Sequence, residues 1–569
     1  MNNPPKRSDQ FWDLGGFWHG GSGPGRAGWV IGFVLVVAVL LRFSALDRAV
    51  YWYDETITSV RIAGYTKEQV EDFFQPQGRP VFPADLAPLQ RSGDRPWLAT
   101  LHSLATETPD QVPLYYLLLR GWTHLAGDSV TAIRAFSALV SLLVFPALVL
   151  FGQAWLADWP RARSVIGLAI GLMAVSPIQV VYAREARGYS LAVVLFLLAS
   201  WALLRALRLD RLGKPTRSAW MTYGVLVACN FYGHLPLALG IAAQGAYVAL
   251  RGWLERSHRG WNALRHNLLA WGGSLLGALV LFSPWLVCWL TYRKPMGWID
   301  RELTWGTLVQ RWGLNFSAIA LDWQACFDRP LFDITQETDP IALSWHWLPI
   351  GLLLALVAFS IRRLLRVASP DIWLFPLLTG AIALPFALLD AVDGGQRSTI
   401  ARYFLPAYLA LTWLLAFGLS EAWANQRRRP WVAGAIALLW VVGLWSSSQG
   451  VMAPTWWNKY SSYDDPAIAQ RVSQLQPPVV ISGNALRLLT LARRLPPQAQ
   501  LIYLEEPDLP LPETIQRAIA YRPKTEWLDR LKTNPRYQIQ AIEPFNNTWA
   551  IQVLDRPAGP GGLSFSPKP

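Results

Sequence analysis

The segment YSLAVVLFLLASWALLRALR at residues 189–208 decides the class of this protein. At a rise of 1.5 Å per residue, a helix of this length extends for about 30 Å, the thickness of the hydrocarbon core of a bilayer. Similar apolar runs lie near 28–46, 130–156, 164–182, 219–233, 235–250, 268–290, 346–361, 371–389, 401–419 and 431–447. The pattern predicts an α-helical polytopic membrane protein with about 11 transmembrane helices.

Composition and charge agree with this class and exclude a purely soluble enzyme. Hydrophobic residues make up 52% of the 569 residues and charged residues only 16%, whereas a soluble domain has about one quarter charged residues. The net charge of +13 follows from the excess of Lys and Arg in cytoplasmic turns, so we expect no nucleic-acid partner. The three cysteines give neither a disulfide framework nor a metal-binding spacing.

The topology depends on how the segment PLYYLLLRGWTHLAG at 113–127 is read. It is short and contains Arg120 and His124, so we predict an amphipathic helix along the outer membrane interface rather than a span. Basic residues then gather in cytoplasmic turns: Arg161, Arg163, Arg205, Arg208, Arg211, Lys214, Arg217, Arg251, Arg256, Arg259, Arg265, Arg362, Arg363, Arg366, Arg427, Arg428 and Arg429. The N-terminus is expected in the cytoplasm, with the run at 28–46 retained as a span and not removed as a signal.

Two loops and the C-terminal region are expected on the outer side. The loops cover about 47–129 and 291–345. Residues 450–569 are predicted to form a small extracytoplasmic α/β domain beside a membrane domain at 1–449, with strands in PVVIS, QLIYLEE, YQIQAI and TWAIQVL and helices in NALRLLTLARRL and near 524–532. The Gly/Pro-rich ends GGSGPGRAG and RPAGPGGLSFSPKP are predicted to be mobile tails.

With this topology, the conspicuous polar clusters meet at the outer surface and suggest one site. Asp54 and Glu55 follow the first span in YWYDETITS, where partial desolvation would raise a carboxyl pKa and suit it to accept a proton. They equally fit a helix end in water. Glu107 and Asp110 precede the 113–127 helix, where acids also favour a helix N-terminus.

Arginines form the second part of this candidate site. In VVYAREARGYSL, Arg184, Glu185 and Arg187 lie in a tight turn; its guanidinium groups could bind phosphate or could simply be solvated. DAVDGGQRSTIARYFLP adds Asp390, Asp393, Arg397 and Arg402 at the outer end of a late span, and FYGHLPL adds His234, which is either structural or functional. No phosphate-binding glycine motif supports a nucleotide-driven mechanism.

Four strings in the chain are similar to the GT-C superfamily of integral-membrane glycosyltransferases, which contains glycosyltransferase family 39, protein O-mannosyltransferases and aminoarabinose transferases. They are WYDE at 52–55, PLYYLLLRGW at 113–122 with GDS and Arg134 after it, SPIQVVYAREARGYSL at 176–191 and ARYFLPAYLAL at 401–411. The resemblance covers about 28–450 and implies a GT-C-like membrane fold.

The resemblance also implies a reaction, in which a sugar moves from a polyprenyl phosphate to an acceptor hydroxyl on the outer (periplasmic or lumenal) face with inversion. Asp54 corresponds to the base and Glu55 supports it, whereas the arginines lie near the donor phosphate. The substrate-binding residues implied are Glu107, Tyr115, Arg184, Glu185, Arg187, Tyr189, His234, Arg397 and Arg402. We expect the acceptor to be a lipid, a glycan or a protein, and we expect the protein to lie in the plasma (inner) membrane in contact with its lipids.

One departure from the family pattern concerns metal binding. Where relatives often have His or Lys and Pro ahead of the PLYY helix, this chain has Gln111 and Val112. No cofactor is therefore assigned, and a divalent metal and the role of Glu107 stay open.

Two other classes of function compete with the transferase. A transporter or flippase of lipid-linked glycans would place ionisable groups near the bilayer midplane, whereas the charges here lie at the ends of the spans. A scaffold that binds glycans or partners through residues 450–569 is the other alternative.

Overall fold

The computed structural model describes residues 26–294, 302–322 and 347–554, apart from 368, 507, 544 and 546. The two predicted tails lie mostly outside the described residues, and so does most of the predicted loop at 291–345.

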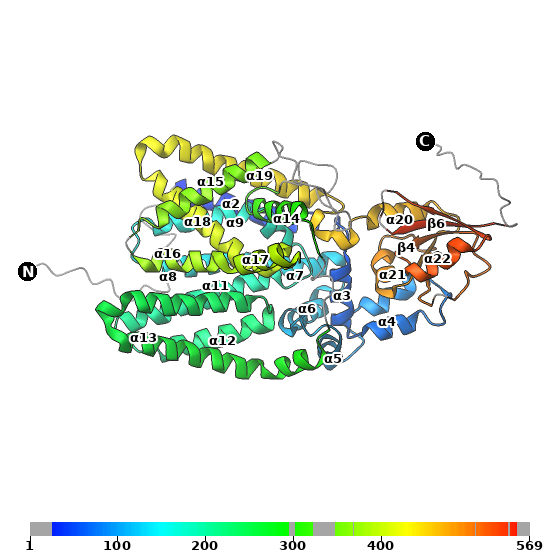
Figure 1. Cartoon of the computed structure of the whole chain (residues 1–569), viewed down its shortest axis with the longest axis horizontal. Coiled ribbons are helices and arrows are strands. Elements are labelled where there is room, and N and C mark those ends of the chain that lie inside the picture. The colour runs from blue at the N-terminus through cyan, green and yellow to red at the C-terminus, as the bar shows by residue number, and fades with distance from the viewer. Residues whose placement is uncertain are drawn as a thin grey trace, which may run out of the picture.

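A bundle of helices forms most of the molecule, and a mixed sheet lies at one end of it (Figure 1). The bundle helices are α2 (Arg26–Phe43), α7 (Val130–Leu142), α8 (Val144–Trp155), α9 (Ala162–Val175), α10 (Pro177–Ala183), α11 (Tyr189–Arg211), α12 (Arg217–Gly233), α13 (Leu237–Tyr292), α14 (Trp305–Ser317), α15 (Trp347–Leu364), α16 (Pro370–Gly380), α17 (Leu384–Asp393), α18 (Leu405–Trp423) and α19 (Arg429–Met452). Short 3₁₀ segments join some of them: η3 (Ala381–Ala383), η4 (Arg397–Thr399), η5 (Ala401–Phe404), η6 (Gln426–Arg428) and η7 (Trp457–Ser462).

All eleven apolar runs predicted from the sequence lie in helices. Among the described residues, seven helices are long and apolar enough to cross a membrane, or eight if the α9–α10 pair, bent by 61°, counts as one span. The protein is therefore an integral membrane protein of the predicted helical class. This number of helices is lower than the eleven predicted spans for three reasons. Helix α12, with 17 residues, is too short to be counted as a span, and so is the apolar part of α2. Helix α13 is counted once although it contains two of the predicted runs.

Helix α13 is a hairpin of two arms rather than one continuous rod. Gly260 has φ 78° and ψ 165°, which breaks the 56-residue helix; positive φ is readily available to glycine because it has no Cβ. The two arms lie side by side, since a Cβ added at Gly245 would meet Trp271 and one at Gly252 would meet Leu264. Figure 1 shows the turn of this hairpin at the end of the bundle opposite the sheet.

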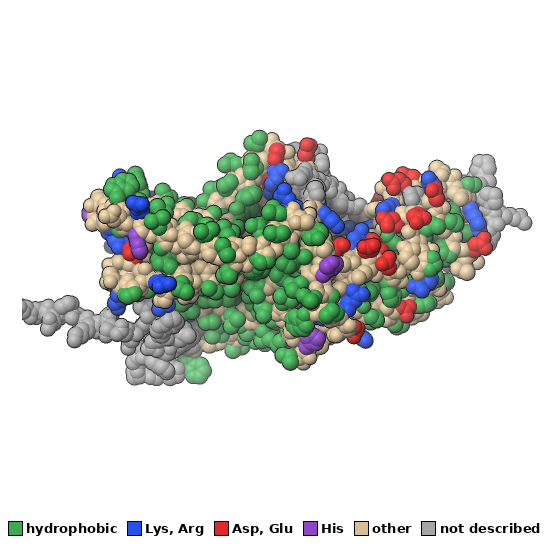
Figure 2. Space-filling view, turned by 90° about the horizontal axis from the view of Figure 1, so that it is seen from below, with side chains coloured by type: hydrophobic (Ala, Val, Ile, Leu, Met, Phe, Trp, Pro, Cys, Tyr) green, Lys and Arg blue, Asp and Glu red, His purple; other side chains and the backbone are tan. Residues whose placement is uncertain are grey.

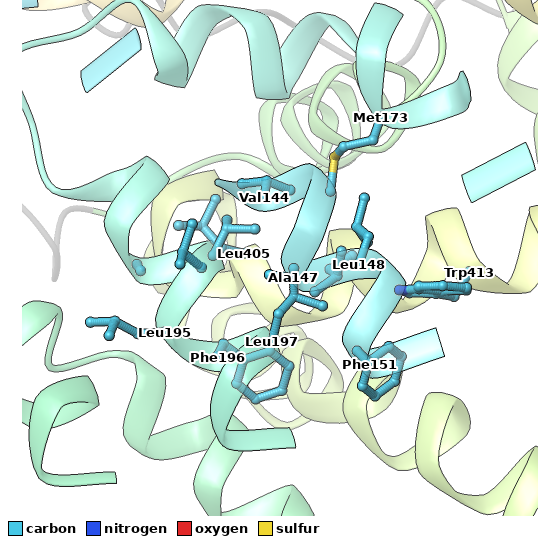
Figure 3. Close-up of a cluster of buried hydrophobic side chains, with 14 of the residues drawn as sticks. Val144, Ala147, Leu148, Phe151, Met173, Leu195, Phe196, Leu197, Leu405 and Trp413 are labelled. Atoms are coloured by element: carbon cyan, nitrogen blue, oxygen red, sulfur yellow. The ribbon is translucent and has the colours of Figure 1, made fainter. Parts of the chain in front are cut away.

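The core of the bundle consists of large apolar side chains from helices far apart in the chain. Figure 3 shows Leu148 and Phe151 of α8 among Met173, Phe196 and Trp413, which come from α9, α11 and α18. Hydrophobic side chains also cover the outside of the bundle, and the charged side chains gather toward the two ends of the molecule (Figure 2). Such a belt is expected where hydrocarbon replaces water as the solvent.

The first loop folds into a compact layer between the bundle and the sheet. It contains α3 (Tyr53–Ala63), α4 (Lys67–Phe73), β1 (Pro80–Val81), η1 (Pro83–Gln90), α5 (Trp97–Glu107) and α6 (Pro113–Ala126). The helix predicted at 113–127 is α6, and it packs against α3, α5, α7 and α12 through a buried face that includes Tyr115, Tyr116 and Leu119.

The C-terminal region is a mixed α/β structure, as predicted. It contains α20 (Asp465–Ser473), β2 (Val479–Ser482), α21 (Ala485–Ala492), β3 (Gln500–Tyr503), β4 (Arg517–Tyr521), α22 (Thr525–Thr533), β5 (Tyr537–Ala541) and β6 (Thr548–Val553). The sheet order is β1-β3-β2-β4-β6-β5, and β3, β2 and β4 are parallel. The prediction placed the four strands β2, β3, β5 and β6 but missed β4 and α20.

The sheet is not built from residues 450–569 alone. Strand β1 of the first loop pairs antiparallel with β3, with Pro80 opposite Ile502. The hydrophobic core on that face of the sheet contains Val60 and Phe74 of the first loop together with Leu489 of α21. Burying this shared apolar surface fixes the first loop to the sheet.

Helix packing in the bundle yields a stability prediction at Gly418. A Cβ there would lie 2.6 Å from Cα of Ser360, so Gly418→Ala should push α15 and α18 apart and lower the melting temperature in detergent, although alanine favours helices by about 1 kcal/mol over glycine. Gly167→Ala, with nothing within 4 Å of the added atom, is the matched control and should be neutral or stabilising. Equal melting temperatures for the two variants would contradict this packing.

Candidate functional site

Helix α3 packs against α21 of the C-terminal region and has two acidic residues in its first turn, Asp54 and Glu55. The Glu55 carboxylate accepts a hydrogen bond from the backbone N–H of Trp52 at 3.3 Å. Acids in this position stabilise the exposed N–H groups of a helix start. The chain therefore starts its helix with one carboxylate turned inward and the other half-buried beside it.

Glu55 forms a fully buried ion pair with Arg134 of α7. The guanidinium donates to both carboxylate oxygens at 2.8 and 2.6 Å, and the backbone N–H of Ala186 adds a third bond at 2.8 Å. Burial by itself would raise the pKa of Glu55, but the adjacent Arg134 outweighs burial and holds this pKa below its usual value. The expectation of a raised pKa is therefore wrong for Glu55, which is a charged structural partner.

Asp54 lies in a different environment, beside the guanidinium of Arg187. Arg187 donates to the hydroxyls of Tyr116 at 2.9 Å and Thr58 at 3.2 Å and reaches the backbone carbonyl of Asp54 at 3.5 Å. The Asp54 carboxylate itself makes no hydrogen bond or ion pair with another residue in the described ranges. The structure thus brings together an acid with an uncommitted carboxylate and a partly buried cation.

A second arginine approaches the same place from the late part of the chain. Nε2 of His234 lies 3.0 Å from the backbone oxygen of Arg402, and the His234 ring packs edge-on against Tyr189 with 5.9 Å between the ring centroids. Asp110 lies within electrostatic range of Asp54, Arg187 and Arg402. Removal from water raises the pKa of Asp110, and the nearby Asp54 charge adds to the effect.

Arg184 does not belong to this cluster. Its guanidinium donates to the backbone carbonyls of Leu41, Ser44 and Ala45, which lie at the end of α2, where carbonyls lack partners within the helix. The expectation that Arg184 binds phosphate is therefore not supported by its position, because its donors are used to cap a helix.

Glu185 has a buried partner that the sequence did not reveal. Its Oε1 accepts from Lys459 and from Asn458, both at 2.7 Å. Burial raises the pKa of Glu185, although the Lys459 charge opposes this shift. Lys459 lies in WWNKY after the last apolar run, and the only sequence signal for its role was a lysine set among aromatic residues. Thr58 and Tyr116 were also missed as partners of Arg187.

Three further candidates have other partners. The Tyr115 hydroxyl forms a hydrogen bond with Ser137 at 2.7 Å inside the bundle. The tyrosine that contacts Arg187 at the candidate site is therefore the neighbouring Tyr116 and not the predicted Tyr115. Glu107 pairs with Arg61 at 3.7 Å. Arg397 pairs with Asp393 at 2.7 Å and Asp390 at 3.3 Å, which closes the loop after α17.

The described residues do not gather the ligands of a metal ion. Among them, no three His, Cys, Asp or Glu side chains lie close enough to share one, and Glu107, the acid for which a metal was left open, faces Arg61. We therefore derive no step through a metal.

The architecture can be compared with known proteins. No family model and no curated protein matches the sequence. Solved structures do match: ArnT from Cupriavidus metallidurans bound to undecaprenyl phosphate is 15% identical, with 94% of this chain and 100% of that chain covered and a TM-score of 0.47. The apo state of that ArnT is 14% identical, with coverage of 94% and 99% and a TM-score of 0.49.

An archaeal oligosaccharyltransferase also matches this chain. The Archaeoglobus fulgidus oligosaccharyltransferase AglB, in complex with an inhibitory peptide and a dolichol-phosphate, is 13% identical, with 86% of this chain and 61% of that chain covered and a TM-score of 0.45. The chain is structurally similar to ArnT and AglB.

The buried ion pair yields a stability prediction with a defined pH dependence. Glu55→Gln leaves Arg134 buried without its counter-charge, which should cost about 3–5 kcal/mol and lower the melting temperature strongly. Because the folded pKa of Glu55 is depressed, the wild-type advantage is complete above the unfolded pKa of about 4.3 and is lost as the pH falls through the folded value.

Melting curves of both proteins in detergent at several pH values test this. Glu71→Gln is the matched control, because Glu71 forms a half-exposed pair with Lys67 at 3.1 Å and such surface pairs contribute less than about 1 kcal/mol. A wild-type advantage over Glu55→Gln that grows as the pH falls below 4 would contradict the assignment.

Proposed function

We propose that the protein is a glycosyltransferase that moves a sugar from a polyprenyl phosphate to an acceptor hydroxyl at the end of the bundle that carries α3 and the sheet. The observation that carries this proposal is the pairing at α3: a half-buried carboxylate with no committed partner, Asp54, beside the cation Arg187. A transfer reaction needs both groups, one for the acceptor proton and one for the leaving phosphate.

Asp54 is the proposed base. It accepts the proton of the acceptor hydroxyl while the hydroxyl oxygen bonds to the anomeric carbon of the sugar. The bond from that carbon to the phosphate oxygen breaks on the opposite side, and its electron pair leaves with the polyprenyl phosphate. Such a direct displacement inverts the anomeric centre. Local positive charge from Arg187 stabilises the charge that develops on the phosphate.

The donor site is proposed around Arg187 and Arg402. Tyr116 and Thr58 hold the Arg187 guanidinium by hydrogen bonds to their hydroxyls, which fixes its direction before a phosphate arrives. The chain of contacts from Tyr189 through His234 to the Arg402 backbone joins the second arginine to the same region. An isoprenoid chain would lie in the bilayer against the apolar belt. One ArnT structure is bound to undecaprenyl phosphate, and one AglB structure is in complex with a dolichol-phosphate. Both lipids are polyprenyl phosphates, the class of carrier that we propose for the donor sugar.

We also propose eleven spans, with the sheet on the outer side of the membrane. This number takes the two arms of α13 as separate crossings and adds α2, α12 and the bent α9–α10 pair to the remaining helices. The Arg-rich turns then lie in the cytoplasm, in agreement with the usual bias of Lys and Arg. The acceptor, whether lipid, glycan or protein, would approach from this outer side, on which we propose that the sheet lies.

Asp54→Asn tests the base. Because the amide cannot accept the acceptor proton, transfer from a labelled polyprenyl-phosphate sugar should fall by about 10²–10⁴-fold, while the melting temperature stays within a few degrees of wild type. Asp72→Asn is the control, since Asp72 is an exposed acid on α4 of the same loop. A folded Asp54→Asn protein as active as wild type would refute the assignment. Movement of the labelled lipid across vesicles without a new glycosidic bond would instead favour a flippase.

Tyr116→Phe and Arg187→Lys test the donor site. The first removes one hydroxyl that holds Arg187, and the second keeps the charge but loses the fork of donors. Both should raise the KM for the lipid-linked donor, and Arg187→Lys should also lower kcat because phosphate charge grows in the transition state. Tyr115→Phe, which removes the hydroxyl bound to Ser137, is the matched control. The assignment is wrong if Tyr115→Phe raises the KM as much as Tyr116→Phe does.

A further inference from the structure

A polar cavity lies at the end of the bundle opposite the candidate site. It has a volume of about 380 Å³ and is lined by residues of α8, α11, α13 and α16 and of the segments that follow α8 and precede α16. These four helices belong to four of the candidate membrane spans. The lining residues thus come from helix ends that lie at the left of Figure 1, at the level where a bilayer would change from hydrocarbon to headgroups.

One wall of the cavity is basic. Arg208 and Arg211 come from the last turn of α11, and Arg251 comes from the first arm of α13. The side chains of Arg208 and Arg211 are 30% and 37% exposed. Asp158 is the carboxylate in the lining, and Glu255, just outside it, pairs with Arg211 and lies 3.5 Å from Arg251.

Positive charge still exceeds negative charge at this end. Arg208 contacts Asp158 at 3.3 Å, but the Asp158 side chain is 90% exposed, and such solvated pairs are weak enough for another anion to replace. The exposed Arg366 precedes Val367 of the lining by one residue.

The rest of the lining is largely apolar and contains one buried donor without an acceptor among the described residues. Leu204, Leu207 and Ile372 belong to it together with Trp155. Trp155 is 5% exposed, and its indole N–H has no hydrogen-bond partner among the described residues. A ligand that suits both parts of the lining carries an anionic oxygen-rich group joined to a hydrocarbon chain.

We propose that this cavity binds the headgroup phosphate of an anionic phospholipid, with an acyl chain against the apolar part of the lining. Arginine forks match phosphate oxygens, and basic pockets between membrane helices are suited to anionic headgroups. The bound lipid joins α8, α11, α13 and α16 at this end of the bundle. This lipid site is separate from the proposed transferase site, and the proposal does not depend on the proposed transferase function.

Lipid binding to the purified full chain in detergent tests the proposal, with native mass spectrometry counting the lipids bound as phosphatidylglycerol is added. The double variant Arg208→Ala/Arg211→Ala should weaken retention of one lipid by about fivefold for each arginine. Arg427→Ala/Arg428→Ala is the control, because these two exposed arginines lie at the same end but outside the cavity lining. Phosphatidylcholine should not occupy the site.

A second variant removes space instead of charge. Ala154 is half-buried and lines the cavity, so Ala154→Trp should fill it and abolish retention of the same lipid while all arginines remain. Inorganic phosphate at 10 mM, as a competitor, should leave the lipid bound. Unchanged lipid retention in the folded double variant or in Ala154→Trp would overturn the proposal. Displacement by inorganic phosphate alone would also overturn it, because the site would then recognise a free anion.

Discussion

The position of the candidate site depends on the ion pair between Glu55 and Arg134. Removing both charges from water is costly, and this pair is tolerable because nearly every polar atom is used: Arg134 also donates to the backbone carbonyls of Leu46, Ala49 and Val50. One guanidinium thereby ties the end of the first span and the start of α3 to α7. Asp54 is held one residue away from this fixed point, so a rigid buried contact determines where an accessible carboxylate lies.

Buried arginines perform the same structural task elsewhere in the bundle. Arg42 donates to the carbonyls of Met173 and Ala174, where α9 ends and the bend to α10 follows. Arg184 does so at the end of α2. Helix ends leave carbonyls without partners, and in a medium without water each such group costs several kcal/mol. The broken and bent helices near the site thus depend on arginine side chains that replace the missing hydrogen bonds.

This use of arginine explains which parts of the structure could be predicted. Long apolar runs locate the helices that are long enough to span hydrocarbon, because its thickness sets their length, and each predicted run lies in a helix. Arg184 and Arg187 stand three residues apart in one turn and look equivalent in the sequence, yet one caps α2 and the other faces Asp54. That difference is decided by neighbours from distant segments. Lys459 was missed for the same reason, and β1 because two residues, Pro80 and Val81, carry no periodic pattern.

The pairing of β1 with β3 has a consequence for how the protein is made. Pro80 and Ile502 are separated by more than 400 residues, so the strand at the edge of the sheet leaves the ribosome long before its partner. Closing so long a loop is slow and entropically unfavourable. The layer around α3 therefore completes its hydrophobic core only after all the helices have been inserted. Folding of the candidate site is in this way coupled to synthesis of the last part of the polypeptide, and we expect a chain released early to retain an unfinished first loop.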